Sequence, residues 1–493
     1  STPKPSSAAS DVYKRQPTWF AQSIIPLGLI LIWYQMILTS SSDFKYRLFV
    51  SIFSIIPTLI LYYWQFPLAN PLLLWSIVIF SVILVAFGLP IFILLASLAI
   101  FFFLSEPTDW ATNYDLISTI SDSAYRIVVS PTLAAIPIFT LAGYILAESN
   151  ISDRLIKFFK ASLGWLPGST VLIVVILCAF FTALTGGSGV TILALGAILY
   201  PILVHDGYSK RFSLGIITTA GSLGLLFPPS LPAIIYSVTA GINPLELFRQ
   251  ALIPAIFLMS IMFFYGLYML PKNKKVEKFN FKNSYSYAKI AKWEIAIPIL
   301  IILSLFSGFA TLVESAALLV LYVLTVELYI FKDVSFKDLP KIIIDCSTLV
   351  GGVLIILGFA MGFTGYLVDA QIPLKILNFV QSTISSKIIF LLALNILLLI
   401  IGCLMDVFSA IIVVVPLIAP LATYFGIDPF HLAIIFIANL ELGYITPPVG
   451  MNLYLSSYRF DKDMPTIYNA TLPFFFIRLI GVLIITYIPL FFY

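Results

Sequence analysis

Charged residues are scarce in this chain. Asp, Glu, Lys and Arg make up only 10% of its 493 residues, whereas 60% are hydrophobic, and the mean hydropathy is +1.06. A soluble protein of this size carries about 25% charged residues. The composition therefore argues against a soluble globular fold and predicts an all-α protein that crosses a membrane many times.

Reactive and metal-ligating side chains are also few. Cys178, Cys346 and Cys403 lie in apolar runs and have the spacing of neither a disulfide framework nor a metal site. The two histidines, His205 and His431, are too far apart in the sequence to argue for a metal site. We find no nucleophile–base pair and no nucleotide loop, and a net charge of +4 is too small and dispersed for nucleic acid. We therefore expect neither an enzyme nor an organic cofactor.

Long apolar stretches are abundant, and each has about the 20 residues that span a bilayer. The candidates are 18–39, 48–67, 72–104, 130–149, 211–240, 245–270, 293–309, 311–331, 342–368, 429–457 and 466–493. The stretch 72–104 is long for one helix and short for two, so its number of passes stays open. Residues 1–16 are polar, and we treat them as a tail or an artefact outside the fold.

One segment of the chain occurs twice, 219 positions apart. Six landmarks keep their spacing without a gap, and five of them match in identity. They are Ala183, Pro201, Gly207, Gly224, Pro228 and Pro229 in the first copy, and Gly402, Pro420, Gly426, Gly443, Pro447 and Pro448 in the second. Paired apolar segments with Gly and Pro breaks at corresponding positions are typical of the substrate site of secondary transporters.

Each copy begins with an apolar stretch that has a break near its middle. The stretches are 166–204, broken at 185–189, and 387–421, broken at 402–406. Two crossing helices would explain each stretch, and so would a re-entrant hairpin that returns to the side it entered. We favour re-entrant hairpins because a Pro-broken helix follows each stretch in the same register.

The distribution of charge predicts the orientation of the two copies. The polar loop 271–292 carries seven lysines and is expected in the cytoplasm, whereas loop 104–125 carries acids without Lys or Arg and is expected outside. Counting spans from these loops, the first hairpin enters from the cytoplasm and the second from outside, which is an inverted-topology repeat. Residues 152–163 and 374–386 are amphipathic and predict either interfacial helices or plain connectors.

The broken helices offer a binding chemistry. Proline frees backbone carbonyls that can coordinate a small cation, and the positive N-terminus of the resumed half-helix can face an anion. Oxygen ligands without a thiol or imidazole cage suit Na⁺. The expected ion sites are Thr185, Gly186, Ser188, Gly221, Ser222 and Gly224 in the first copy, and Gly402, Met405, Asp406, Asn439, Gly443 and Thr446 in the second. The expected substrate residues are Ser188, Pro229, Ser230, Pro448 and Asn452.

Three acids lie in apolar surroundings, where an ionisable group is costly and often functional. Glu314 follows Thr311 and has the position of a helix-start residue as well as that of a functional one. Asp406 can cap the second limb of its hairpin, a role compatible with shaping an ion site. Glu441 can contact an ion or a proton, or hydrogen-bond to a neighbouring helix.

At these positions the sequence resembles a known family. The matching blocks are 186–189 with 195–196 and 201, 207–208, 221–230, 314–317, 406, 426–429 and 446–452. Together they resemble the large membrane subunit of tripartite ATP-independent periplasmic (TRAP) transporters over about residues 72–493, with repeats at about 130–270 and 342–493. Residues 17–71 resemble the last helix of the small subunit followed by the helix of fused permeases, so the small-subunit part is expected to be incomplete.

The resemblance implies a secondary transporter of the bacterial inner membrane with an elevator mechanism. A periplasmic binding protein would deliver an organic anion, such as a carboxylate or sialic acid, and a Na⁺ gradient would drive its uptake. A small permease subunit would be a further partner. The alternatives are a stand-alone dicarboxylate or anion symporter of related architecture and, as another class, a channel. No repeated filter or charge ring favours the channel, and the substrate itself cannot be read from this chain.

Overall fold

The computed structural model describes residues 91–105, 120, 122, 125, 130–271 and 279–491. The expectations for 1–16, 17–71 and 72–90 lie outside these residues. The chain divides into two compact units, residues 1–74 and 75–493. All described residues belong to the second unit, and the following description is of that unit alone.

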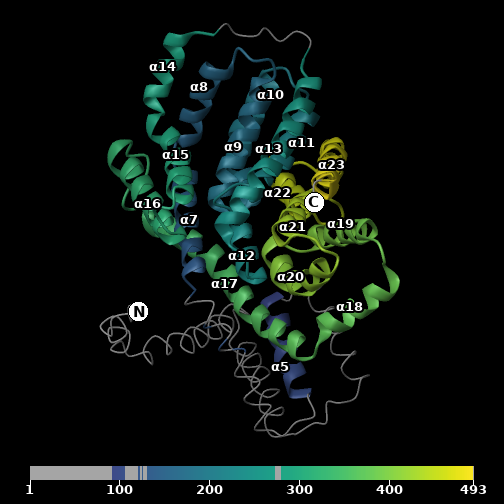
Figure 1. Ribbon diagram of the computed structural model, residues 1–493. Helices are drawn as coiled ribbons and strands as arrows, with labels where there is room; N and C mark the ends of the chain where they lie inside the picture. The colour runs from purple at the N-terminus through teal and green to yellow at the C-terminus, as the bar shows by residue number, and fades with distance from the viewer. Residues whose placement is uncertain are drawn as a thin grey trace, which may run out of the picture. The chain divides into compact units, whose positions relative to one another are not determined.

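Every regular element in the described residues is helical, as the composition predicts. The elements are α5 Ile91–Ser105, α7 Pro131–Glu148, α8 Ile151–Leu163, α9 Ser169–Thr185, α10 Ser188–His205, α11 Lys210–Ala220, η1 Leu223–Leu226, α12 Leu231–Ala240, α13 Pro244–Tyr268, α14 Phe281–Ile290, α15 Lys292–Phe306, α16 Leu312–Thr325, η2 Val326–Ile330, α17 Leu339–Asp369, α18 Ile372–Thr383, α19 Lys387–Leu404, α20 Val407–Tyr424, α21 Pro429–Gly443, α22 Met451–Phe460, α23 Met464–Tyr487 and η3 Ile488–Phe491 (Figure 1).

The sequence repeat is also a structural repeat. Shifted by 219 positions, the bounds of α10 fall on those of α20, and α11 and α21 begin at equivalent residues. The caps correspond as well, because Ser209 caps α11 and its equivalent Asp428 caps α21 through side-chain oxygens. The breaks match too, since the Pro228-Pro229 and Pro447-Pro448 bonds are both cis. The two copies therefore fold alike from their hairpins onward.

Each copy contains one helical hairpin and one interrupted helix. In the first hairpin only Gly186 and Gly187 separate α9 from α10, and Gly186 has a φ of 70°, a conformation that glycine adopts without strain. In the second hairpin Met405 and Asp406 separate α19 from α20. The predicted break of 211–240 is present, because α11 with η1 is bent by 43° from α12.

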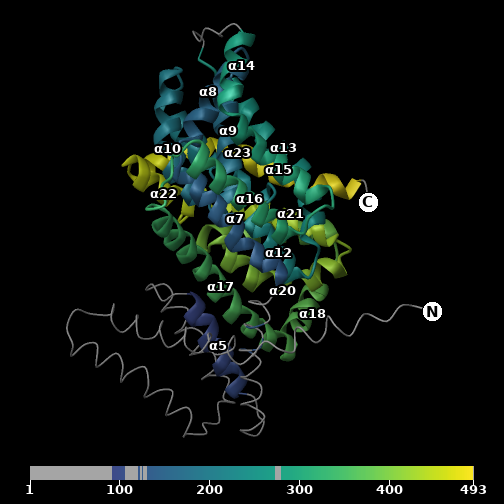
Figure 2. The same ribbon diagram turned by 90° about the vertical axis from the view of Figure 1, so that its left-hand side faces the viewer.

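The hairpins and interrupted helices pack reciprocally between the copies. The second limb of the first hairpin, α10, packs on α22, and the second limb of the other hairpin, α20, packs on α12. Both views show α20 beside α12 (Figures 1 and 2). Within each copy the first limb packs on the interrupted helix, α9 on η1 and α19 on α21. Exchanged contacts of this kind are those of an inverted pair related by a pseudo-two-fold axis.

By length and composition, seven helices in the described part can cross a membrane, or up to nine if each bent pair is one span. The amphipathic stretches 152–163 and 374–386 are helices, α8 and α18, and α8 turns 75° away from α7. The region 271–292 differs from the expected loop because it contains α14. Asn280 caps this helix through its side chain, which accepts from the Asn283 amide.

Candidate functional site

The first hairpin tip packs against the first helix break. The Thr182 hydroxyl, one turn before the tip, donates to the Gly221 carbonyl at 2.7 Å and lies 2.6 Å from the Thr191 hydroxyl. The Thr185 hydroxyl lies 2.9 Å from the Phe181 carbonyl oxygen of its own helix and 3.3 Å from the Gly187 carbonyl oxygen in the tip. Thus α9 and α10 bring hydroxyl groups to the carbonyl end of α11, where the sequence predicts the first ion site.

Two glycines allow these close approaches, one in each copy. A Cβ added at Gly224 would lie 2.2 Å from the Ala179 carbonyl oxygen, and one at Gly443 would lie 2.5 Å from the Gly402 carbonyl carbon. Gly224 and Gly443 are equivalent landmarks of the repeat, and so are Ala183 and Gly402. The Ala183 amide nitrogen would lie 2.6 Å from a Cβ added at Gly224. The breaks therefore touch the hairpins backbone to backbone.

The first tip also meets the second helix break. Ser188, the first residue of α10, donates from its hydroxyl to the Asn452 carboxamide oxygen at 2.7 Å, and Asn452 donates to the Thr218 carbonyl at 3.1 Å. All three residues are buried. Ser188 and Asn452 were both predicted as substrate residues, and they come from opposite copies of the repeat. The N-termini of α10 and α22 meet at this hydrogen bond.

The remaining first-copy substrate residues lie at the start of α12. The Ser230 hydroxyl accepts from the Ala233 amide as the helix cap and donates to the Leu225 carbonyl. Pro229 precedes it and is buried. The tip lies beside them, because a Cβ at Gly186 would meet the Leu231 side chain at 2.7 Å. Ser230 thus fixes the end of the unwound segment next to the hairpin.

The second tip is built around Asp406, which caps α20. Its Oδ1 accepts from the amides of Phe408 and Ser409 at 2.9 and 3.0 Å. The Val407 amide donates to the Tyr444 hydroxyl at 2.7 Å. The Gly450 amide donates to the Cys403 carbonyl at 3.2 Å. The predicted capping role of Asp406 is therefore present, and Met405 lies beside it in the turn between the two helices.

Three predicted site residues have their contacts elsewhere. Asn439 donates at 2.8 Å to the Asn395 carboxamide oxygen, which also accepts from the Thr486 hydroxyl at 3.2 Å. Thr446, just after α21, donates to the Leu442 carbonyl in the last turn of that helix. Pro448 is exposed, and its carbonyl accepts from the Tyr468 hydroxyl. Asn439 thus joins α21 to α19, and Asn395 joins α19 to α23.

Ser222 also turns away from the first tip, toward a buried ion pair. Arg478 of α23 donates from Nη2 to Glu441 Oε2, and its Nη1 lies 3.1 Å from the Ser222 hydroxyl. Both charged side chains have 0% exposure. For Glu441 this confirms a hydrogen bond to a neighbouring helix. Arg478 was missed, and its signal was a lone charge inside the apolar stretch 466–493.

Glu314 has the role of a helix-start residue. It forms a capping box with Thr311, each side chain accepting from the other's backbone amide at 3.3 and 2.8 Å. This confirms the predicted capping role for Glu314 and places the residue at the exposed start of α16.

A second charge cluster, away from the tips, was not predicted. Arg154 of α8 contacts Glu294 of α15, Glu327 of η2 and Asp333, the last at 2.5 Å. Burial of Asp333 raises its pKa, but hydrogen bonds from Arg154 and from the Asn150 amide outweigh burial and hold the pKa below its usual value. The cluster fastens the amphipathic helix α8 to α15, to η2 and to Asp333 just after η2.

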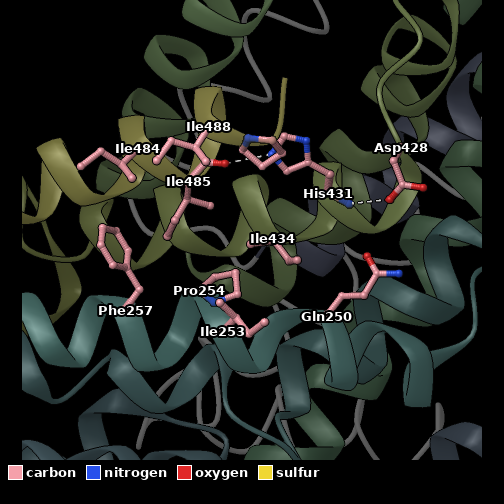
Figure 3. A pocket seen from close by; sticks show the side chains of 11 residues that line it. Gln250, Ile253, Pro254, Phe257, Asp428, His431, Ile434, Ile484, Ile485 and Ile488 are labelled. Carbon is pink, nitrogen blue, oxygen red and sulfur yellow. Dashed lines mark hydrogen bonds between the residues drawn. The ribbon is translucent and has the colours of Figure 1, made fainter. Parts of the chain in front are cut away.

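A cavity of about 620 Å³ lies apart from all predicted site residues. Figure 3 shows its lining, with Pro254 and Phe257 of α13 facing Ile434 of α21 and Ile485 of α23. Its lining is largely apolar, and His431 at one end has its Nε2 3.0 Å from the Ile485 carbonyl oxygen. The cavity therefore lacks the convergent polar groups of the hairpin tips.

Fold and site together define a class of protein. Hairpins that meet the breaks of interrupted helices across an inverted repeat are the architecture of a secondary transporter. Among solved structures the chain is similar to the YdaH transporter of Alcanivorax borkumensis, with a TM-score of 0.56 over 77% of this chain and 89% of that one. Sequence identity to it is 13%, so this likeness concerns the fold.

Sequence comparison identifies the family. Residues 77–491 match the model of the DctM component of tripartite ATP-independent periplasmic transporters. A similar relative is the C4-dicarboxylate TRAP transporter large permease protein DctM of Pseudomonas aeruginosa, 33% identical over 73% of this chain and 84% of the relative. The isethionate TRAP transporter permease protein DctMQ of Oleidesulfovibrio alaskensis is 30% identical over 76% of this chain and 59% of the relative.

The chain therefore belongs to the DctM family of TRAP transporter large permeases. It is a multi-pass protein of the bacterial inner membrane. Its relatives are transporter permeases and not enzymes. The resemblance found in the sequence is confirmed for the large subunit, whereas the predicted small-subunit part at 17–71 lies outside the described residues.

Proposed function

We propose that this permease imports an organic anion, driven by a Na⁺ gradient and supplied by a periplasmic binding protein. The observation that carries the proposal is the hydrogen bond between Ser188 and Asn452. It brings together the N-termini of α10 and α22, each of which carries a partial positive charge that favours an anion. The two half-helices come from opposite copies, so a ligand between them would contact both.

Backbone geometry supports the cation sites. The carbonyl ends of α11 and α21 stop at the two breaks, and helix C-termini carry partial negative charge. Gly224 and Gly443 let the hairpins approach these ends within backbone contact. Carbonyl and hydroxyl oxygens are ligands for a hard ion, and the described residues hold no cluster of three or more His, Cys, Asp or Glu suited to a metal. Na⁺ is the coupling ion that this chemistry fits.

We propose an elevator mechanism for the movement. The hairpins and interrupted helices share contacts across the copies, so they can travel as one body. The amphipathic helices α8 and α18 precede the hairpins and would connect this body to α7, α16 and α17. Arg154 would anchor α8 on the static side, because its acidic partners belong to α15, to η2 and to the residues just after η2.

The substrate class and the partners follow from the family. The two relatives are named for a C4-dicarboxylate and for isethionate, which are both small organic anions. The family description names a tripartite periplasmic system. We therefore propose a periplasmic binding protein and a small permease subunit as partners, with the substrate chosen largely by the binding protein.

The test is uptake into proteoliposomes that contain the permease and its small subunit. Radiolabelled succinate and isethionate serve as probes, with the cognate binding protein present or absent and an inward gradient of Na⁺ or K⁺. Accumulation that needs both Na⁺ and the binding protein is expected. Uptake that is indifferent to the binding protein would indicate a stand-alone symporter, and uptake under K⁺ equal to that under Na⁺ would refute Na⁺ coupling.

A further inference from the structure

Arg478 joins the two helix breaks to each other. Its Nη2 donates to Glu441, and its Nη1 lies 3.1 Å from the Ser222 hydroxyl and 3.4 Å from the Thr219 carbonyl oxygen. Ser222 and Glu441 are equivalent positions of the repeat, 219 residues apart. One guanidinium thus holds the matching position in both copies.

The two breaks lie back to back at this point. The Ser222 hydroxyl is 3.5 Å from the Glu441 backbone oxygen, and η1 packs against α21. The residue equivalent to Arg478 in the first copy is Met259 of α13. The link is therefore a single asymmetric element placed where the pseudo-two-fold axis brings the unwound segments together.

The surroundings make a purely structural role a poor explanation. Arg478 is fully buried in an apolar helix, and a charge at such a depth is costly. Among the described residues its Nε has no hydrogen-bond partner. A buried ion pair contributes little stability compared with well-packed apolar residues of the same volume. The ion pair has a geometric consequence, because any shift of one break moves the Arg478 guanidinium that contacts the other break.

We infer that Arg478 is a positioning residue that couples the two ion sites, so that filling one break orders the other. This inference rests on the proposed Na⁺ coupling. Arg478 acts through Ser222 and Glu441 and does not itself touch the ion. The coupling makes Na⁺ binding cooperative, and coupling between two binding sites typically changes affinity about 5–150-fold.

The experiment measures binding of ²²Na⁺ to the purified full chain over a range of concentrations. The test variant is the double substitution Glu441→Gln with Arg478→Gln, which removes both charges and leaves no unpaired one. Arg478→Lys is the conservative variant, and Arg211→Gln is the matched control, since Arg211 also joins α11 to α23, through the Asn469 carbonyl at 2.6 Å, but at the surface.

Wild type and Arg211→Gln are expected to bind Na⁺ with a Hill coefficient above 1. In the double variant the coefficient should fall to about 1, with affinity weakened about tenfold, and Arg478→Lys should restore part of both. A folded double variant with wild-type cooperativity and affinity would overturn the inference while leaving Na⁺ coupling intact. Absence of Na⁺ binding by the wild type would instead overturn the proposed function.

Hydrogen exchange provides a readout that does not depend on Na⁺. If Arg478 couples the breaks, Glu441→Gln alone should speed amide exchange in 220–230 and in 443–450 together. Faster exchange in only one of these segments, or in neither, would contradict the link.

Discussion

The two hairpin tips share a backbone plan but differ in chemistry. At the first tip Ser188 meets Asn452 in a buried hydrogen bond. In the equivalent contact, between α20 and α12, the corresponding residues are Val407 and Ala233, which are also buried but apolar. The second tip instead places a carboxylate, Asp406, in the turn between its two helices.

The tips also differ in exposure. Pro229 and Ser230 of the first break are buried, whereas the equivalent residues of the second break, Pro448 and Val449, are exposed. The common feature is the backbone contact between break and hairpin at Gly224 and Gly443. The comparison teaches that the repeat conserves geometry for carbonyl ligands, while side chains give each tip its own task.

The largest effect is expected from the feature that the tips share. Gly224→Ala and Gly443→Ala each force a methyl group against backbone, and overpacking of this kind costs about 1–3 kcal/mol or more. Both variants should lose thermal stability in detergent and lose uptake. Gly351→Ala is the control, because nothing lies within 4 Å of its added Cβ. Loss at only one of the two glycines would break the proposed equivalence.

The next effect separates two roles of Asp406. Asp406→Asn keeps a capping oxygen, whereas Asp406→Ala removes it at a cost of about 1 kcal/mol. If the carboxylate also serves the ion, both variants should reduce Na⁺-driven uptake about tenfold to a hundredfold, since interactions with a charged group contribute about 1.5–3 kcal/mol. Thermal unfolding would report the cap, and initial uptake rates would report the ion. Normal uptake in Asp406→Asn would leave Asp406 with capping alone.

A smaller effect is expected at the hydrogen bond between Ser188 and Asn452 at the first tip. Ser188→Ala and Asn452→Ala should each raise the KM for the transported anion about tenfold, because each removes a polar group from the proposed anion site, where a hydrogen bond to a charged group contributes about 1.5–3 kcal/mol. The increase in KM of the double variant, expressed as a free energy, should be smaller than the sum for the two single variants, because effects of residues in contact are not additive. Val407→Ala, at the equivalent apolar position, should leave KM unchanged. An equal change of KM in Val407→Ala and in Ser188→Ala would contradict the proposed difference in role between the two tips.

The smallest effect lies outside both tips, at Asp333. Its pKa is lowered in the folded protein, so the group stabilises the fold above its unfolded pKa of about 3.9 and this contribution is lost as pH falls through the lower folded pKa. Asp333→Asn should slightly lower the unfolding temperature at pH 7 and flatten its dependence on acid pH. The exposed Asp345→Asn serves as the control. An unchanged acid profile would contradict the contact with Arg154.

The helix breaks and caps near the proposed site could be predicted because they depend on local sequence. Pro228-Pro229 and Pro447-Pro448 must interrupt a helix wherever it packs. Asp406 and Thr311 stand where caps are needed, and the structure has both as caps. Ser222 and Asn439 show where this approach stopped, because their neighbours in sequence do not reveal that their side chains face Arg478 and Asn395.

The membrane class, the family, the repeat and the positions of the breaks could all be predicted from the amino-acid sequence. These follow from hydropathy, from spacing and from the backbone restrictions of glycine and proline, which act within a few residues. Which distant groups meet depends on how the helices pack, as the contacts of Ser188 with Asn452 and of Arg478 with Glu441 show. Such contacts join residues that are tens to hundreds of positions apart in the chain, and packing alone selects them.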